Sequence, residues 1–220
     1  MGREFVEIFD EWVHTYDDSV YGKDKEYEDV FADYDGILQA VADLAKGPVV
    51  EFGVGTGNLT EKLLGRGLEV AGIEPNRAMR EATAQKLPGT PLIDGDFLEF
   101  DAKLEAKSFV STYAFHHLTD QEKARAFKLY AEKLPAGGKV VFADTLFETE
   151  EAKQQKIEFE SARGYANLVE DLNREYYTTL PVMQQLIEAA GFAVEFTQLN
   201  EYVWLINATK RSGNGRESRQ

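Results

Sequence analysis

Short apolar runs alternate with segments whose apolar residues recur at helical spacing along most of the chain. Five such runs, which we predict to be strands, begin at Val49, Leu68, Thr90, Ser108 and Val140. Two further strands, over 192–198 and 202–209, are predicted to form a closing antiparallel hairpin. Strands that alternate with helices in this way are typical of a mostly parallel sheet with helices packed against it.

Helical spacing also occurs outside this alternation. Apolar residues from Phe5 to Tyr16, and again from Tyr27 to Val41, predict two helices ahead of the first strand. A charged helical segment over 149–174 has no matching strand. Because no internal repeat or second apolar pattern is present, we expect a single domain over 1–210 and a frayed polar tail over 211–220.

Composition narrows the class of protein. The 220 residues are 43% hydrophobic and include no cysteine, so disulfides, zinc fingers and thiol nucleophiles are excluded. No apolar run approaches the ~20 residues that span a bilayer, and we predict a cytoplasmic protein without a membrane partner. The net charge of −15 disfavours nucleic acid and favours small neutral or cationic ligands.

The first predicted strand ends in an acidic residue and a glycine-rich turn, Glu51-Phe52-Gly53-Val54-Gly55-Thr56-Gly57, before a helix begins at Asn58. Glycines allow a tight turn and the close approach of a ligand to the backbone, and the first strand-to-helix turn of such sheets binds nucleotides. The dinucleotide fingerprint requires another glycine at the position of Asn58. The turn therefore favours a different nucleotide-containing ligand.

Polar residues also follow the next strands. Glu74 ends the second strand, 21 residues after Gly53, where a carboxylate accepts hydrogen bonds from ribose hydroxyls. Asp96 and Phe97 follow the third strand. His116 and His117 lie on the loop after the fourth strand, ahead of a helix that Thr119-Asp120-Gln121-Glu122 begins as a capping box. All of these residues are predicted to lie at the carboxyl edge of the sheet, where open α/β folds bind ligands.

These features, together with the turn Leu134-Pro135-Ala136-Gly137-Gly138, resemble the class I S-adenosylmethionine (SAM) dependent methyltransferases of the small-molecule type. The chain is most similar to a group of uncharacterised methyltransferases from Gram-positive bacteria. The resemblance implies a Rossmann-like, seven-stranded, mostly parallel sheet with helices on both faces and a reversed last strand. Ser108 departs from the aspartate that more often begins the fourth strand in this family.

The resemblance also implies roles for individual residues. Glu74 would accept hydrogen bonds from the ribose of SAM and Asp96 from the adenine amino group, while an N-terminal helical lid over 1–45 would cover the cofactor and an insertion over 145–180 would shape the acceptor pocket. The implied cofactor contacts come from Gly53, Glu74, Asp96, Glu51, Gly55, Phe97 and Tyr16.

The acceptor side is less defined by the sequence. His116 and His117 are candidates for a general base, although either could equally be structural. The fourth strand is not followed by the carboxylate cluster of metal-dependent catechol-type enzymes, so no metal site is predicted. Methyl transfer needs no obligatory catalytic residue, and a non-catalytic SAM-binding domain therefore remains open. An NAD(P)-dependent oxidoreductase is disfavoured by Asn58, and an aminopropyltransferase by the lack of an acidic cluster after the fourth strand.

Overall fold

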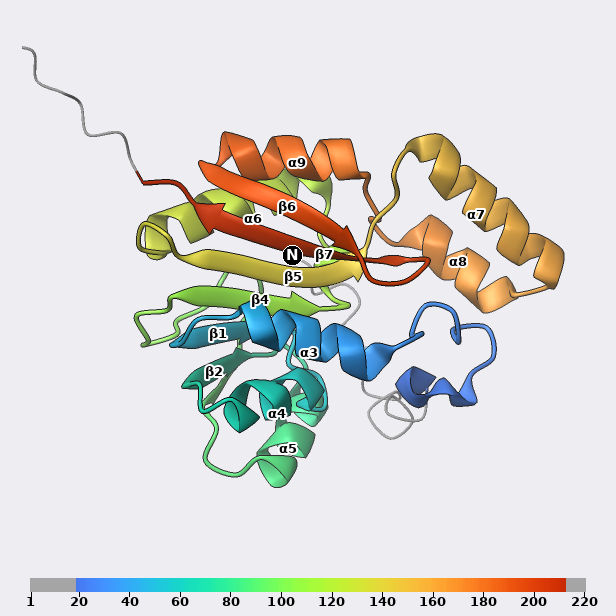
Figure 1. Ribbon diagram of the computed structural model, residues 1–220. Coiled ribbons are helices and arrows are strands. Elements are labelled where there is room, and N and C mark those ends of the chain that lie inside the picture. The colour runs from blue at the N-terminus through green and yellow to red at the C-terminus, as the bar shows by residue number, and fades with distance from the viewer. Residues whose placement is uncertain (1–18, 213–220) are drawn as a thin grey trace, which may run out of the picture.

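Seven strands form one twisted sheet in the computed structural model, which describes residues 19–212 (Figure 1). The strands are β1 (Val49–Phe52), β2 (Val70–Ile73), β3 (Leu92–Ile93), β4 (Ser108–Thr112), β5 (Lys139–Thr145), β6 (Phe192–Gln198) and β7 (Val203–Lys210). Their order is β3-β2-β1-β4-β5-β7-β6; the first five are parallel, and β7 is antiparallel to both of its neighbours. The predicted fold class is confirmed, and β3, which Pro91 directly precedes, lies at one edge of the sheet.

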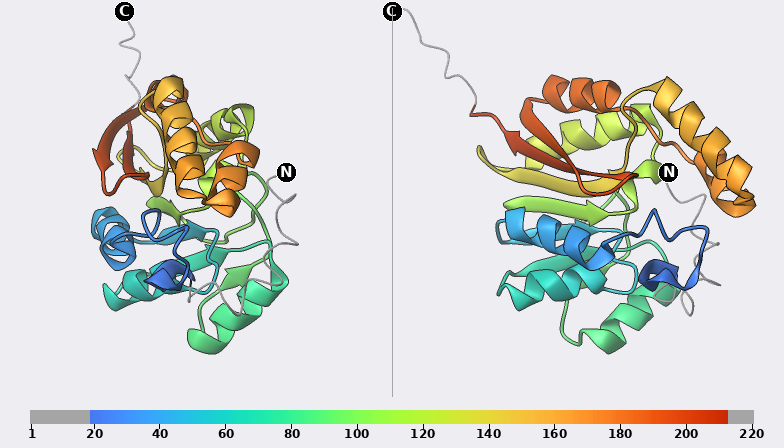
Figure 2. Two further views of the ribbon diagram at one scale, coloured as in Figure 1. Left: turned by 90° about the vertical axis from the view of Figure 1, so that its right-hand side faces the viewer. Right: turned by 45° about the vertical axis from the view of Figure 1, so that its right-hand side comes forward.

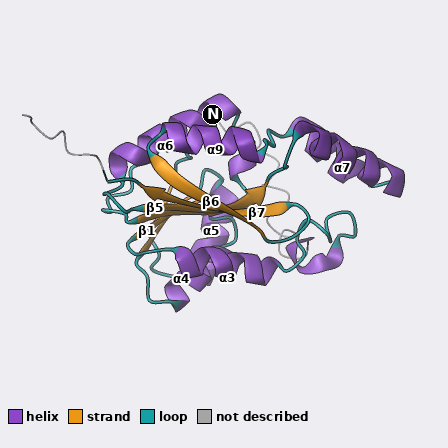
Figure 3. Cartoon of the chain, turned by 45° about the horizontal axis from the view of Figure 1, so that its top comes forward, coloured by secondary structure: helices purple, strands orange, loops and turns teal. Residues whose placement is uncertain are grey.

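Helices cover both faces of this sheet (Figure 3). The helices of the described residues are η1 (Ser19–Lys23), α3 (Tyr34–Leu44), α4 (Asn58–Gly65), α5 (Arg77–Lys86), η2 (Phe115–His117), α6 (Asp120–Lys133), α7 (Glu150–Arg163), α8 (Ala166–Arg174) and α9 (Leu180–Ala189). Helices α3 and α4 pack on one face around Val41 and Leu63, and α6 and α9 pack on the other around Phe127 and Ile187. Because both faces are covered, the central strands β1 and β5 are buried along nearly their whole length.

The helix start predicted at Thr119 is confirmed by its cap, and α5 begins with a cap of its own. Thr119 and Glu122 form the reciprocal capping box of α6, and the Asn76 side chain accepts a hydrogen bond of 2.9 Å from the Met79 N–H at the start of α5. Both caps end the loops that follow the carboxyl ends of β2 and β4. The loops that carry the candidate site therefore run straight into helices whose first turns are held in place.

The helix predicted from Tyr27 begins only at Tyr34, so this part of the prediction is wrong. Asp33 has a left-handed backbone conformation (φ 57°), which interrupts the helical path, and residues 24–33 form a series of turns instead. The apolar spacing still reports burial, because the Phe31 ring packs against Tyr34 and Tyr113, with centroids 6.0 and 5.1 Å away. Tyr16 and the first predicted helix lie outside the described residues.

Helices α7 and α8 stand beyond the carboxyl ends of the parallel strands, on the side that Figure 2 (left) turns toward the viewer. The turns over 24–33 reach them from the other half of the sheet. Glu26 accepts hydrogen bonds from the backbone N–H groups of Asn167 and Leu168 in the first turn of α8, and Arg163 donates to Asp29 over 2.6 Å. Among residues 19–212, no helix combines the length and apolar composition needed to cross a membrane.

Candidate functional site

The glycine turn after β1 is tightly packed at Gly53 and open at Gly55. Gly53 has a positive φ of 64°, and a Cβ added there would lie 2.8 Å from the Cβ of Ala114. Gly55 also has a positive φ, of 55°, but a Cβ added there would meet no described atom within 4 Å. The turn therefore needs glycine at both positions for its conformation, and at Gly53 also for its packing against the loop after β4.

Glu74 at the end of β2 lies directly beside this turn. Its carboxylate accepts hydrogen bonds from the N–H of Gly55 over 3.0 Å and from the N–H of Asn76 over 2.8 Å. Burial raises the pKa of Glu74, and the two amides oppose that rise. A carboxylate has about four acceptor sites, so two further donors, such as a pair of ribose hydroxyls, can be accommodated. The residues present therefore fit the nucleoside end of SAM.

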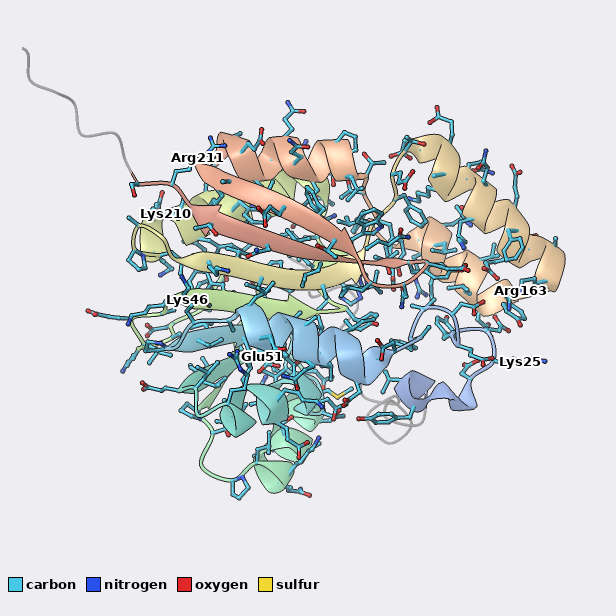
Figure 4. All side chains as sticks on the ribbon, in the orientation of Figure 1. Lys25, Lys46, Glu51, Arg163, Lys210 and Arg211 are labelled. Carbon is cyan, nitrogen blue, oxygen red and sulfur yellow. The ribbon has the colours of Figure 1, made fainter. Side chains whose placement is uncertain are left out.

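Glu51 is buried near the end of β1, just before the glycine turn. Its carboxylate accepts a hydrogen bond of 2.7 Å from the Thr60 hydroxyl, and Figure 4 shows the labelled Glu51 side chain between β1 and α4. Only 1% of the residue is exposed, and burial raises its pKa to about 8. This contact assigns Glu51 a role in joining β1 to the helix that follows the glycine turn.

Asp96 and Phe97 follow β3 on the same edge of the sheet. One carboxylate oxygen of Asp96 accepts the N–H groups of Leu98 and Glu99, both at 2.9 Å, which fixes the turn. The Phe97 ring is 7% exposed and packs against Phe52 and Phe115 in the core. The Phe97 ring therefore belongs to the core beneath the turn, and only the backbone of Phe97 is in a position to contact a ligand.

His116 and His117 form the short helix η2 after β4, and a buried aspartate at the end of β5 holds this loop. One oxygen of Asp144 accepts the N–H groups of Phe115 and His116 over 2.7 and 3.2 Å, and the other lies 2.6 Å from His116 Nδ1. Although burial disfavours the imidazolium ion, Asp144 and Glu175 raise the pKa of His116. Burial and the neighbouring charge of His116 together hold the pKa of His117 well below its ordinary value.

Glu175, which follows α8, faces both histidines. Its carboxylate oxygens lie 3.3 Å from His116 Nε2 and 3.8 Å from His117 Nε2. The Tyr177 hydroxyl donates to Glu175 over 2.5 Å, and the Tyr177 ring stacks on His116 with centroids 4.9 Å apart. Two histidines, two carboxylates and a tyrosine are thereby brought together from three separate parts of the chain.

A buried lysine explains how residues so far apart in sequence meet. Lys123 in α6 donates from Nζ to the carbonyl oxygens of Leu118 and Tyr176, over 2.5 and 2.6 Å. The Tyr176 N–H in turn donates to the His116 carbonyl over 3.1 Å. Only 1% of the Lys123 side chain is exposed, and burial lowers its pKa. Lys123 thus clamps the segment after α8 to the loop after β4.

These residues border a cavity of about 110 Å³ between the sheet edge, the turns over 24–33 and α8. Aromatic rings form much of its wall, and they come from Tyr27, Phe31, Tyr113, Tyr177 and Tyr202. Tyr113 has a positive φ of 52°, an uncommon conformation for a residue with a side chain, directly at the end of β4. His116, His117 and Glu175 complete the lining beside these rings.

The sequence analysis predicted part of this site and missed part of it. The structure places Gly53, Gly55, Glu74 and Asp96 together at the carboxyl edge, with His116 and His117 on the adjoining loop. Asp144 was missed, although the rule that located Glu74 at the end of its strand applies equally to Asp144 at the end of β5. Glu175 was also missed, and no local pattern distinguishes it from the other acidic residues of that charged segment.

Known structures with the same fold bind SAM. The human N-acetylserotonin methyltransferase in complex with SAM has a TM-score of 0.63 at 17% identity, covering 83% of this chain and 53% of that one. The magnesium protoporphyrin IX methyltransferase of Synechocystis with bound SAM has a TM-score of 0.64 at 15% identity, covering 92% of this chain and 95% of that one. The chain therefore has the fold of known SAM-binding methyltransferase structures.

Sequence comparison then identifies the family. A family model described as a methyltransferase domain matches residues 49–138. An uncharacterized methyltransferase of Bacillus cytotoxicus is 52% identical over 212 residues, covering 96% of this chain and 100% of the relative. One from Geobacillus kaustophilus is 53% identical over 214 residues, with the same coverage. The chain belongs to this methyltransferase family of Gram-positive bacteria.

Proposed function

We propose that this methyltransferase transfers a methyl group from SAM to a small molecule held in the cavity beside His116 and His117. The observation that carries the proposal is the buried Glu74 carboxylate, which accepts a hydrogen bond from the Gly55 N–H. A Cβ added at Gly55 would meet no described atom, so there is room for a ligand beside it, and the carboxylate has acceptor sites left for that ligand. The cavity borders the loop after β4, whose Ala114 packs directly on Gly53 of the same turn. Donor and acceptor sites are therefore neighbours along one edge of the sheet.

The residues assigned to the donor site have distinct tasks. Glu74 would hold the ribose, Asp96 and the Phe97 backbone the adenine, and the turn from Gly53 to Gly55 the remainder of the cofactor. Bound SAM supplies an electrophilic methyl group on a sulfonium centre. The chain itself contributes positioning and the exclusion of water, and positioning alone can supply ~7 to 11 kcal/mol toward the barrier.

The acceptor is proposed to be a small molecule because the cavity is confined and aromatic. The net charge of −15 disfavours a nucleic-acid acceptor. A cytoplasmic location and the lid role of the segment containing Tyr16 remain predictions from the sequence. So does the assignment of the pocket-forming insertion to 145–180, which contributes Leu168, Leu172 and Glu175 to the cavity wall.

Calorimetric titration with SAM, S-adenosylhomocysteine and NAD tests the donor site. We expect the first two to bind and NAD not to bind. Glu74→Ala should weaken SAM binding at least tenfold, or ~1.4 kcal/mol, which is about one hydrogen bond to a charged group. Glu69→Ala is the matched control, because Glu69 is exposed and lies just before β2, at its opposite end. Circular dichroism should show that both variants are folded.

The other outcomes discriminate between the alternatives. Binding of NAD, or SAM binding that Glu74→Ala leaves unchanged, would refute the assignment of the donor site. A protein that binds SAM but forms no S-adenosylhomocysteine would favour the non-catalytic alternative. This result requires that neither slow hydrolysis of SAM nor transfer to any small acceptor in a screen is detected.

A further inference from the structure

Three potential metal ligands converge on the cavity wall. One ligand atom each from His116, His117 and Glu175 can be chosen so that all three lie within 4.8 Å of one another. Their side chains are only 10%, 12% and 11% exposed, so the group is not a surface cluster. We propose that His116, His117 and Glu175 bind a divalent transition-metal ion at a site open to the cavity.

The surroundings of these side chains are those expected for metal ligands. His116 presents Nε2 toward Glu175 while its Nδ1 donates to the buried Asp144 over 2.6 Å. The His117 backbone N–H donates to the Ala114 carbonyl over 3.3 Å, which holds the residue in η2. Metal-bound histidines almost always donate their second ring N–H to a carboxylate or carbonyl, which orients the ring and makes the free nitrogen a better ligand.

Glu175 is supported in a similar way. The Tyr177 hydroxyl donates to its Oε2 over 2.5 Å, and Lys123 fixes the adjoining backbone through the Tyr176 carbonyl. A carboxylate oxygen that accepts one hydrogen bond still has a lone pair for a metal ion. The ligand group is thus supported by hydrogen bonds that involve Asp144, Tyr177 and Lys123.

The ligand types restrict the choice of ion. Two imidazoles and one carboxylate, without any thiolate, suit Zn²⁺, Fe²⁺, Co²⁺ or Ni²⁺ better than the all-oxygen sites of Mg²⁺ and Ca²⁺. At metal–ligand distances of about 2.1 Å, neighbouring ligand atoms lie roughly 3.0 to 3.5 Å apart. The pair His116 Nε2 and Glu175 Oε2, 3.3 Å apart, already meets this requirement. His117 Nε2 lies 3.8 Å from the other carboxylate oxygen, Oε1, and the three ligand atoms lie within 4.8 Å of one another, so binding requires the ligands to move closer together.

The inference deepens the proposed function and rests on it where the acceptor is concerned. Three protein ligands leave at least one coordination position of the ion free, as in the catalytic zinc sites formed by two histidines and a glutamate. Since all three residues line the cavity, that position faces the acceptor. The acceptor would then be a molecule that coordinates the ion through a hydroxyl or amino group, and the ion rather than a free histidine would lower the pKa of that group.

The rival explanation is a metal-free ion network, with a His116 imidazolium ion held between Asp144 and Glu175. The two explanations differ in what they require of His117. A metal site uses it as a ligand, whereas the network of His116 with two carboxylates is complete without it.

Titration of the chelator-treated full-length protein with Co²⁺ and Zn²⁺, in the absence of SAM, tests the proposal. We expect one ion per chain, visible absorption from bound Co²⁺, and displacement of Co²⁺ by Zn²⁺. His117→Gln and Glu175→Gln should each weaken binding by at least tenfold, and Asp144→Asn by about 10- to 100-fold through its loss of orientation of His116. Glu170→Gln is the matched control, because that carboxylate lies on α8 with 70% of its side chain exposed.

Co²⁺ binding that survives His117→Gln and Glu175→Gln, or no stoichiometric binding by the unmodified chain, would overturn the metal site. Glu175→Gln retains an acceptor for the Tyr177 hydroxyl, and circular dichroism should show that the metal-free variant is folded. SAM titration of the same variants separates the two proposals. If SAM binds and metal does not, the metal site fails while the proposed function stands.

Discussion

Glu51 provides a quantitative test of how the site is built. Its carboxylate is 1% exposed and bonded to Thr60, and burial raises its pKa from an ordinary 4.5 to about 8. The Thr60 hydroxyl opposes this rise, and the nearby Glu74 carboxylate adds to it. Glu51 is therefore protonated in the native state at neutral pH, whereas the same residue in the unfolded chain is ionised.

The sign of the pH dependence follows from this difference. Above pH 4.5 the unfolded chain releases a proton that native Glu51 keeps until about pH 8, so the free energy of unfolding falls as pH rises between these values. Each pH unit within that window costs about 1.36 kcal/mol, and the whole window about 5 kcal/mol. Glu51→Gln removes the titration and keeps an acceptor for the Thr60 hydroxyl.

Urea denaturation of both proteins at several pH values measures the effect. Between about pH 5.5 and about pH 7.5, Glu51→Gln should gain ~2.7 kcal/mol relative to the unmodified chain, which corresponds to roughly 1 M in the urea midpoint. Glu61→Gln, whose carboxylate is 62% exposed on the next helix, is the control. The reasoning is refuted if the difference between Glu51→Gln and the unmodified chain stays constant with pH, as it should for the control.

Two further predictions concern the backbone and the clamp. Gly53→Ala should destabilise the protein by ~2 to 3 kcal/mol and Gly55→Ala by only ~1 kcal/mol in urea denaturation, because both positions have positive φ but only the former meets a neighbour, at 2.8 Å. Equal losses would show that the Ala114 contact is irrelevant. Lys123→Met should cost ~2 to 4 kcal/mol, because two buried carbonyls lose a charged donor, and should increase hydrogen exchange at Tyr176. An unchanged exchange rate there would contradict the clamp.

Much of the donor site is a local property of the chain and could therefore be predicted. Glu74 follows the buried strand β2 and Asp96 follows the short edge strand β3, and parallel strands bring their carboxyl ends to one edge. Asp144 obeys the same rule and was open to the same prediction. The helix predicted from Tyr27 shows the limit of periodicity, because apolar spacing reports which side chains are buried, while the left-handed Asp33 determines where the helix begins.

The acceptor side could not be derived in this way, because its geometry depends on contacts between distant segments. Glu175 contacts His116 because α8 ends beside the loop after β4. The buried ammonium group of Lys123 joins the two segments through their backbone carbonyls. Nothing in the spacing of charged residues over 149–175 distinguishes Glu175 from Glu170, yet the Glu175 side chain is 11% exposed and that of Glu170 is 70% exposed. The expectation of no metal site came from inspecting the end of one strand. The ligand group that the structure brings together takes two residues from that strand's exit and the third from 58 residues beyond His117, so a search confined to consecutive residues could not have found it.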